Sequence, residues 1–191
     1  MQVGIAKQAL HCATHNGDQC GYWRVNDKII LCIADGLGHG EQAEIAALAA
    51  IGCVAINVDR SISEIFEFAN EKIRRTRGVA MAIVVIDELS GCLEYAAVGN
   101  IRGLLQRRQK MLRLSNGYGI IGAGYKNLII ENHVIESGDL IILVTDGIRE
   151  MISLEKYESD LLGDVHKLSQ QILRDWRHSR DDAAVLVFKM E

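Results

Sequence analysis

Apolar positions along the chain form short strand-like runs, interrupted by two stretches with helical spacing early on and one late. Residues 31–34 are apolar throughout, as in a strand that is buried on both faces. Between 41 and 57 the apolar residues recur at helical spacing, and Ser61 with Glu64 forms a capping-box pattern that predicts a second helix. The predicted strands are 3–10, 21–26, 29–34, 79–86, 93–98, 102–106, 111–114, 128–135, 140–145 and 183–189, with a last helix over 161–178.

This order of elements predicts the fold class. Two helices inserted early into a run of strands, with another near the end, favour sheets that are covered by helices. Turn residues such as 89–91 and 137–138 join most strands as hairpins, so we predict an α+β fold and not a parallel βαβ fold. We expect residues 1–191 to form a single domain, because no repeat, low-complexity tract or linker interrupts the sequence.

Composition narrows the class of protein. The 191 residues are 49% hydrophobic and 24% charged, as in an ordinary globular chain. The 21 basic and 25 acidic residues give a net charge of −4, which argues against a nucleic-acid partner. The longest uncharged apolar run, 45–56, is too short to span a bilayer, so no membrane partner is expected. No signal peptide is recognisable and the five cysteines show no pattern, so we expect a cytoplasmic, reduced protein.

Candidate chemistry lies with aspartates at the ends of predicted strands: Asp18, Asp35, Asp146 and Asp181. Asp35 and Asp146 each follow an apolar strand and precede a glycine. Carboxylates that converge repel one another unless cations lie between them, and sites made of oxygen ligands suit Mg²⁺ or Mn²⁺. One Asp-Gly pair is an ordinary turn. Two such pairs after buried strands, with Asp181-Asp182 before another strand, favour a metal site.

Two other patterns have simpler interpretations. Residues 117–122 match GxGxxG, but strand-like sequence follows where a dinucleotide site requires a helix, so a loop is expected. His11, Cys12, His15 and Cys20 have the residue types of a zinc site. Their spacing matches no zinc-finger pattern, and we expect ordinary strand and loop residues there.

Taken in order, several short motifs are similar to those of one family. Residues 17–18, 34–40, 98–100, 138–147 and 180–183 resemble the motifs of the metal-dependent protein phosphatases of type 2C, in particular the bacterial SpoIIE/RsbX-like branch. The resemblance extends over about 17–188. It implies a four-layer αββα sandwich, in which two antiparallel β-sheets are flanked by helices and a two-metal cleft lies at one end.

The resemblance also implies roles for individual residues. Asp35 would bridge two Mn²⁺ or Mg²⁺ ions. The Gly36 carbonyl would bind one of these ions, Asp18 would complete the second, and Asp146 and Asp181 would hold the first. The ions would activate a water molecule for in-line attack on phosphorus, which makes Asp35, Asp146 and Asp181 the expected catalytic residues.

Some positions depart from the pattern of the family. Asp182 stands where many members have asparagine, and we expect it behind the ligands, with direct metal binding as the alternative. Thr14 replaces a phosphate-binding arginine, and Leu37 replaces a candidate general-acid histidine, as is common in the bacterial branch. His39 and His15 are candidates for the missing roles, with an ordinary loop residue as the alternative for His39.

The function implied by the resemblance is that of a serine/threonine protein phosphatase. The chain has the length of a catalytic domain alone, which suggests phosphorylated STAS-domain proteins of a stressosome as substrates. The alternative is a phosphatase-like binding or regulatory protein with little or no turnover, motivated by the missing arginine. The four acidic positions argue against this alternative, because a pure scaffold has no physical need for acids that repel one another.

Overall fold

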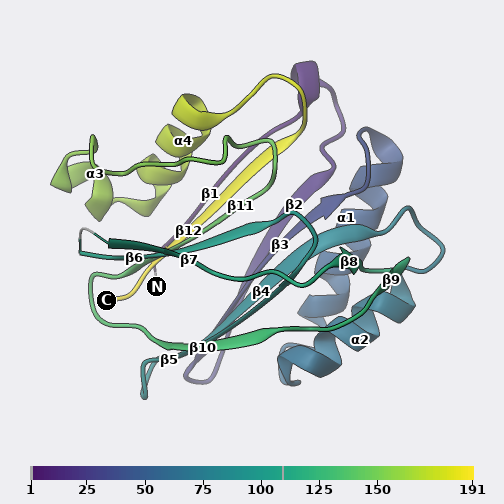
Figure 1. The fold of residues 1–191 in the computed structure, drawn as a ribbon, viewed down its shortest axis with the longest axis horizontal. Coiled ribbons are helices and arrows are strands. Elements are labelled where there is room, and N and C mark those ends of the chain that lie inside the picture. The colour runs from purple at the N-terminus through teal and green to yellow at the C-terminus, as the bar shows by residue number, and fades with distance from the viewer. Residues whose placement is uncertain (1, 109) are drawn as a thin grey trace.

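In the computed structural model, which describes residues 2–108 and 110–191, two antiparallel sheets pack face to face and helices cover their outer faces (Figure 1). One sheet has the order β1 (Gln2–Gln8), β12 (Ala183–Lys189), β11 (Leu140–Val144), β6 (Arg102–Arg107) and β7 (Lys110–Arg113). The other has the order β10 (Ile130–Val134), β5 (Cys92–Val98), β4 (Val79–Asp87), β3 (Lys28–Gly36) and β2 (Asp18–Val25). The predicted four-layer α+β sandwich is confirmed.

The helices lie on opposite sides of this sandwich (Figure 1). The helices α1 (Glu41–Ala55) and α2 (Ile62–Lys72) cover the β2–β5 sheet, and α3 (Ser159–Gly163) and α4 (Val165–Trp176) cover the other. A short 3-10 helix, Leu10–Cys12, and the ribbon of β8 (Gly119–Ile120) and β9 (Gly124–Tyr125) lie outside the two sheets. Within the described range 110–191 no helix directly follows Gly117, as expected, but the segment expected to be a loop contains the short strand β8, which pairs with β9. No helix within 2–108 and 110–191 is long and apolar enough to cross a membrane.

Apolar side chains fill all three spaces between the four layers. On β3, Leu31 and Ile33 point into the core between the sheets, while Ile30 and Cys32 pack under α1 and α2. This explains the continuous apolar run, because both faces of the strand are buried. In the same way, successive residues of β11 serve the central core and the layer beneath α4.

Polar side chains determine where two of the helices begin. At α2 the predicted capping box is present: the Ser61 amide donates to Glu64 Oε2 at 3.0 Å, and the Glu64 amide donates to Ser61 Oγ at 3.4 Å. The predicted helix over 161–178 is wrong in its extent, because α3 ends at Gly163 and α4 begins anew. The Asp164 carboxylate accepts the amides of residues 166 and 167, which caps α4 and interrupts the helical run.

The antiparallel register brings four chain segments to one end of the sandwich. Asp18 at the start of β2 pairs with Asp35 near the end of β3. Val144 at the end of β11 pairs with Val185 near the start of β12, so the residues just outside those two strands are neighbours as well. Segments that are far apart in the sequence therefore meet at the same edge of both sheets.

Candidate metal centre

A cavity of about 360 Å³ opens at the end of the sandwich where these segments meet. Its lining combines carboxylates with small and apolar residues: Asp35, Leu37, Gly38, Ala80, Gly99, Asn100, Ile120, Asp146 and Asp181. Three of the four strand-end aspartates thus line one space, and the fourth, Asp18, is buried beside Asp35. Among the described residues, no lysine, arginine or histidine lines the cavity.

Asp18 and Asp35 form a strongly perturbed pair. Burial, the largest cause, and the charges of Asp18, Asp146 and Asp181 together raise the pKa of Asp35 to about 9. Burial likewise raises the pKa of Asp18 to about 7, partly opposed by a hydrogen bond from Thr145. Without a cation, the folded chain therefore holds these carboxyl groups in an environment that disfavours their ionised form.

Asp146 and Asp181 come from the other sheet, on the segments after β11 and before β12. Asn100 Nδ2 donates to Asp146 Oδ2 at 2.7 Å, and His178 Nε2 donates to the Asp146 carbonyl at 2.8 Å. Burial raises the pKa of Asp181, and the charges of Asp146 and Asp182 add to the rise. His178 thus joins the loop before β12 to the turn that carries Asp146.

Thr145 connects the two sheets at the site. Its hydroxyl donates to Asp18 Oδ2 at 2.6 Å and accepts the Ala184 amide at 2.9 Å, and the side chain is fully buried. The orientation of Asp18, on β2, is therefore set by a residue at the end of β11. Sequence reasoning missed Thr145, although a hydroxyl directly before the Asp146-Gly147 pair, at the end of an apolar strand, was a visible signal.

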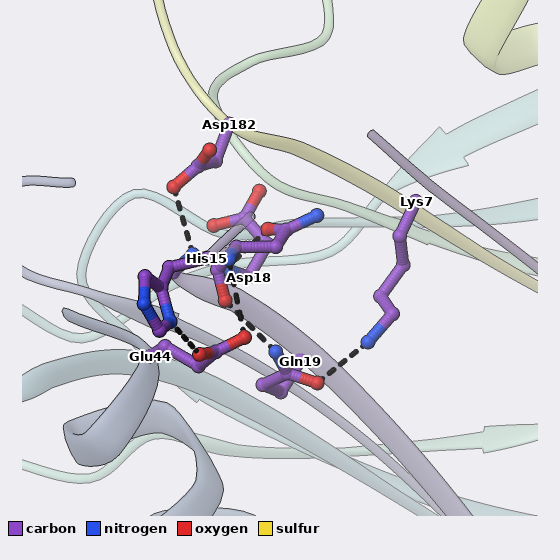
Figure 2. Close-up of polar contacts among 8 residues, drawn as sticks. Lys7, His15, Asp18, Gln19, Glu44 and Asp182 are labelled. Atoms are coloured by element: carbon purple, nitrogen blue, oxygen red, sulfur yellow. Dashed lines mark hydrogen bonds and ion pairs between the residues drawn. The ribbon is translucent and has the colours of Figure 1, made fainter. Parts of the chain in front are cut away.

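Asp182 has both of its carboxylate oxygens occupied by backbone amides. Oδ1 accepts from the Leu10 amide and Oδ2 from the Gly17 amide, each at 2.7 Å, and the residue is buried. Figure 2 shows Asp182 above the segment that leads into Asp18. This carboxylate holds the segment 10–17 in place and is not among the residues that line the cavity.

The same segment is held from the other side by α1. His15 Nδ1 donates to Glu44 Oε2 at 2.6 Å, and the Asn16 amide donates to Glu44 Oε1 at 3.2 Å (Figure 2). The hydrogen bond that His15 donates to Glu44 raises the pKa of His15. His15 therefore has a partner outside the cavity lining. His39 and Thr14 are exposed and do not line the cavity either, whereas Leu37 does.

Arg102 supports the turn that carries Asp146. Its guanidinium is buried, and it donates to the carbonyls of Arg149 at 2.7 Å, Thr145 at 3.2 Å and Ile148. Burial lowers the pKa of Arg102. Sequence reasoning missed this role. The available signal was a single arginine within the otherwise apolar run of 101–105.

Gly36 brings its backbone close to α1, and a side chain cannot be accommodated there. A Cβ atom on Gly36 would lie 2.1 Å from the Ala43 carbonyl oxygen. The Gly36 amide donates to the Gly17 carbonyl at 3.0 Å, which ties the ends of the β2 and β3 segments together. Glycine at this position thus follows from close packing against the start of α1.

The donor set suits a hard divalent cation. The described residues contain no ready-made group of three or more His, Cys, Asp and Glu side chains that could hold a metal ion. Mg²⁺ is commonly bound by one or two carboxylates and keeps several water molecules, so it does not require such a group. Carboxylates that raise one another's pKa, beside a cavity lined by no basic residue, are the environment that such a cation would stabilise.

Comparisons with known proteins agree with this fold. The RsbX structure in complex with magnesium superposes with a TM-score of 0.82 at 20% identity, covering 98% of this chain and 94% of RsbX. A second solved structure has a TM-score of 0.88 at 29% identity and covers 97% of both chains. Its description concerns the bacterial stressosome, a modular system that has been adapted to control secondary messenger signaling. The fold is therefore shared with these proteins and with the PP2C phosphatase domain of SpoIIE from Bacillus subtilis.

The sequence itself identifies the family. The model of the family described as Stage II sporulation protein E (SpoIIE) matches residues 26–191, and the chain belongs to this family. The phosphoserine phosphatase RsbX of Bacillus subtilis (strain 168) is 30% identical over 90 residues. That alignment covers 45% of this chain and 45% of RsbX.

Proposed function

We propose that this protein is a metal-dependent phosphatase that hydrolyses phosphoserine and phosphothreonine in proteins. The observation that carries the proposal is the convergence of acidic residues from both sheets, Asp18 and Asp35 from one and Asp146 and Asp181 from the other, at a single cavity. Membership of the SpoIIE family and the similarity to the phosphoserine phosphatase RsbX support it.

We assign the candidate ligands to two Mn²⁺ or Mg²⁺ ions. Asp35 would bridge the ions, the Gly36 carbonyl would bind one of them, Asp18 would complete the second, and Asp146 and Asp181 would hold the first. When bound, such ions lower the pKa of a coordinated water and neutralise charge on the phosphoryl oxygens. The magnesium complex of RsbX, which has the same fold, supports this choice of metal.

The contribution of the chain itself is to orient the carboxylates. The Asn100 amide fixes Asp146 through Oδ2, and the Thr145 hydroxyl fixes Asp18 through Oδ2. Asp182 holds the segment that leads into Asp18. Hydrogen bonds of this kind set ligand positions before a ligand arrives, which reduces the reorganisation needed during reaction.

We extend the proposal to the substrate and the compartment. Phosphorylated STAS-domain proteins of the stressosome type are the proposed substrates, and the cytoplasm is the proposed compartment. The similarity to RsbX and to the structure described under the bacterial stressosome supports this extension. Cys20, Cys32, Cys53 and Cys92 are free thiols, as expected in a reducing compartment.

The test is hydrolysis of a phosphothreonine peptide with Mn²⁺ or Mg²⁺, comparing the wild type with Asp35→Asn. We expect the substitution to lower kcat/KM by about a thousandfold or more, since metal catalysis supplies several kcal/mol. Asp59→Asn, at an exposed aspartate with no hydrogen bond or ion pair to a described residue, is the matched control and should match the wild type. Activity that persists in chelator or in Asp35→Asn would contradict the proposal.

A binding or regulatory protein with little turnover is the second candidate. The observation that favours it is that no group of three or more candidate ligands is already assembled among the described residues. Titration with Mn²⁺ by calorimetry separates the two functions. Saturable binding that Asp35→Asn removes supports the phosphatase, and no binding at millimolar Mn²⁺ supports the alternative.

A further inference from the structure

The cavity that would receive a phosphate ester is lined by acids and by no basic side chain of the described residues. A phosphoryl group carries up to two negative charges and three strong acceptor oxygens. Arginine is well suited to bind it, because the planar guanidinium donates two parallel hydrogen bonds. A guanidinium at the rim of the cavity that is close and has no other partner would therefore suit a phosphate ester.

Arg77 is the residue that meets these conditions. A Cβ atom on Gly38, which lines the cavity, would lie 3.0 Å from Arg77 Nη1. The guanidinium therefore packs directly against the loop that follows Asp35. Gly38 has φ of +84°, so both its backbone conformation and the neighbouring guanidinium favour glycine there.

Backbone hydrogen bonds hold the segment that carries Arg77 against the site. The Leu37 amide donates to the Gly78 carbonyl at 3.0 Å, and the strand register continues with Gly36 opposite Val79. On the other side, Thr76 Oγ1 donates to the Ile73 carbonyl at 2.7 Å and accepts the Gly78 amide at 3.1 Å. Arg77 thus projects from an anchored turn next to the ligand-bearing strand.

The guanidinium of Arg77 is also available. The side chain is exposed and makes no hydrogen bond or ion pair with a described residue. Arg74, three positions earlier, differs in this respect, because its Nη1 pairs with Glu71 Oε2 at 3.0 Å. An unpaired arginine beside an acidic cavity has two favourable partners: the carboxylates themselves and an anion bound among the metal ions.

We infer that Arg77 binds the phosphoryl group of the phosphoserine or phosphothreonine substrate. This role presupposes the proposed phosphatase function. It would supply, from the loop between α2 and β4, the cation that the resemblance to the type 2C phosphatases leads us to expect at the position of Thr14. Arg77 would raise the affinity for the phosphorylated side chain, while the carboxylate ligands would stay in place without it.

The kinetic test compares Arg77→Ala and Arg77→Lys with the wild type on a phosphothreonine peptide in Mg²⁺. Charge-assisted hydrogen bonds to phosphate predict a rise in KM of about tenfold to a hundredfold for Arg77→Ala, with a smaller change in kcat. Arg77→Lys should recover part of the loss, because lysine keeps the charge and loses the planar fork. Arg75→Ala, at an exposed arginine two positions earlier, is the matched control and should leave KM unchanged.

A binding test separates this inference from the proposed function. Inorganic phosphate is titrated by calorimetry into each variant with Mg²⁺ present, and thermal unfolding verifies that each variant is folded. We expect Arg77→Ala to weaken phosphate binding by about tenfold or more and Arg75→Ala to leave it unchanged. Equal phosphate affinity and equal KM in Arg77→Ala and the wild type, or no phosphate binding by the wild type, would overturn the inference. Wild-type protein that binds phosphate through Arg77 but hydrolyses no peptide would refute the phosphatase and retain the anion site.

Discussion

Each end of the β6–β11 strand pair carries an arginine and an aspartate, but the two residues form an ion pair at only one of the ends. At one end, Arg107 donates to Asp139 Oδ2 through Nε at 2.9 Å and Nη2 at 2.7 Å, and the Glu136 amide donates to the same oxygen. Asp139 is buried, with its charge matched by an ion pair. This carboxylate contributes to the stability of the fold through the hydrogen bonds that Oδ2 accepts from Arg107 and from the Glu136 amide.

At the other end, Arg102 lies opposite Val144 and Asp146 follows two residues later, and Arg102 and Asp146 form no direct ion pair. The Arg102 guanidinium donates to backbone carbonyls of the turn 145–149, and Asp146 receives the neutral amide of Asn100. The arginine therefore shapes the turn without neutralising its carboxylate. The charge of Asp139 is therefore balanced by Arg107 within the protein, whereas the charge of Asp146 remains available to a bound cation.

The largest expected effect comes from Arg102→Met. Three buried carbonyls of the 145–149 turn would lose a charged hydrogen-bond donor. We therefore expect the free energy of unfolding to fall by about 3 kcal/mol. Phosphatase activity should fall as well, because Asp146 is carried by this turn. Urea denaturation and peptide hydrolysis measure the two effects. Unchanged stability would show that water replaces the guanidinium and that the turn keeps its conformation without Arg102.

Asp139→Ala is expected to have the next largest effect, at the opposite end of the strand pair. It removes the acceptor of two Arg107 hydrogen bonds and of the Glu136 amide, so the free energy of unfolding should fall by about 2 kcal/mol. Metal affinity should not change. A loss of Mn²⁺ binding in a folded Asp139→Ala variant would remove the distinction drawn between the two ends.

The buried aspartates Asp18 and Asp35 should make the free energy of unfolding fall as pH rises. Burial raises the pKa of Asp35 to about 9 and that of Asp18 to about 7, whereas an unfolded aspartate titrates near 4. Between these values the folded chain binds more protons than the unfolded chain. The free energy of unfolding of the metal-free protein therefore falls as pH rises from about 4 to about 9.

Asp35→Asn tests this pH dependence. Without metal, the variant should be more stable than the wild type at pH 8 by about 1 kcal/mol, since asparagine does not ionise and so removes the cost of keeping residue 35 protonated in the folded chain at a pH where the unfolded aspartate is ionised. Its stability should also vary less with pH, whereas Asp59→Asn should follow the wild type. Urea denaturation in chelator from pH 5 to pH 9 measures this, and parallel curves for Asp35→Asn and the wild type would contradict it.

His178→Ala should have the smallest effect on stability, about 1 kcal/mol, because one hydrogen bond to the Asp146 carbonyl is lost. The same substitution should affect the affinity for metal more than it affects stability. Groups that orient ligands typically change metal affinity by about 10- to 100-fold. Calorimetric titration with Mn²⁺ measures this, and His178→Gln, which keeps a donor, should be closer to the wild type. Equal affinities in all three proteins would limit His178 to a structural role.

Local patterns predicted much of the fold because their causes are local. The apolar run 31–34, the capping box of Ser61 and Glu64, and the boundaries of 183–189 follow from burial, hydrogen bonding and strand periodicity within a few residues. The break between α3 and α4 was missed. Helical spacing continues across it, and only the Asp164 carboxylate on the amides of the next turn interrupts the helix.

The sequence by itself determined which residue types stand at the ends of the strands, and therefore that carboxylates would meet at one edge. Tertiary structure alone decided what each carboxylate does. Asp181 faces the cavity, while its neighbour Asp182 binds two backbone amides of a segment more than 160 positions away. It also decided that Arg102 reaches carbonyls and that Arg77 lies against Gly38. The partners of a polar group are chosen by which distant segments pack around it, and this choice has no signature in the local pattern of hydrophobic and polar residues.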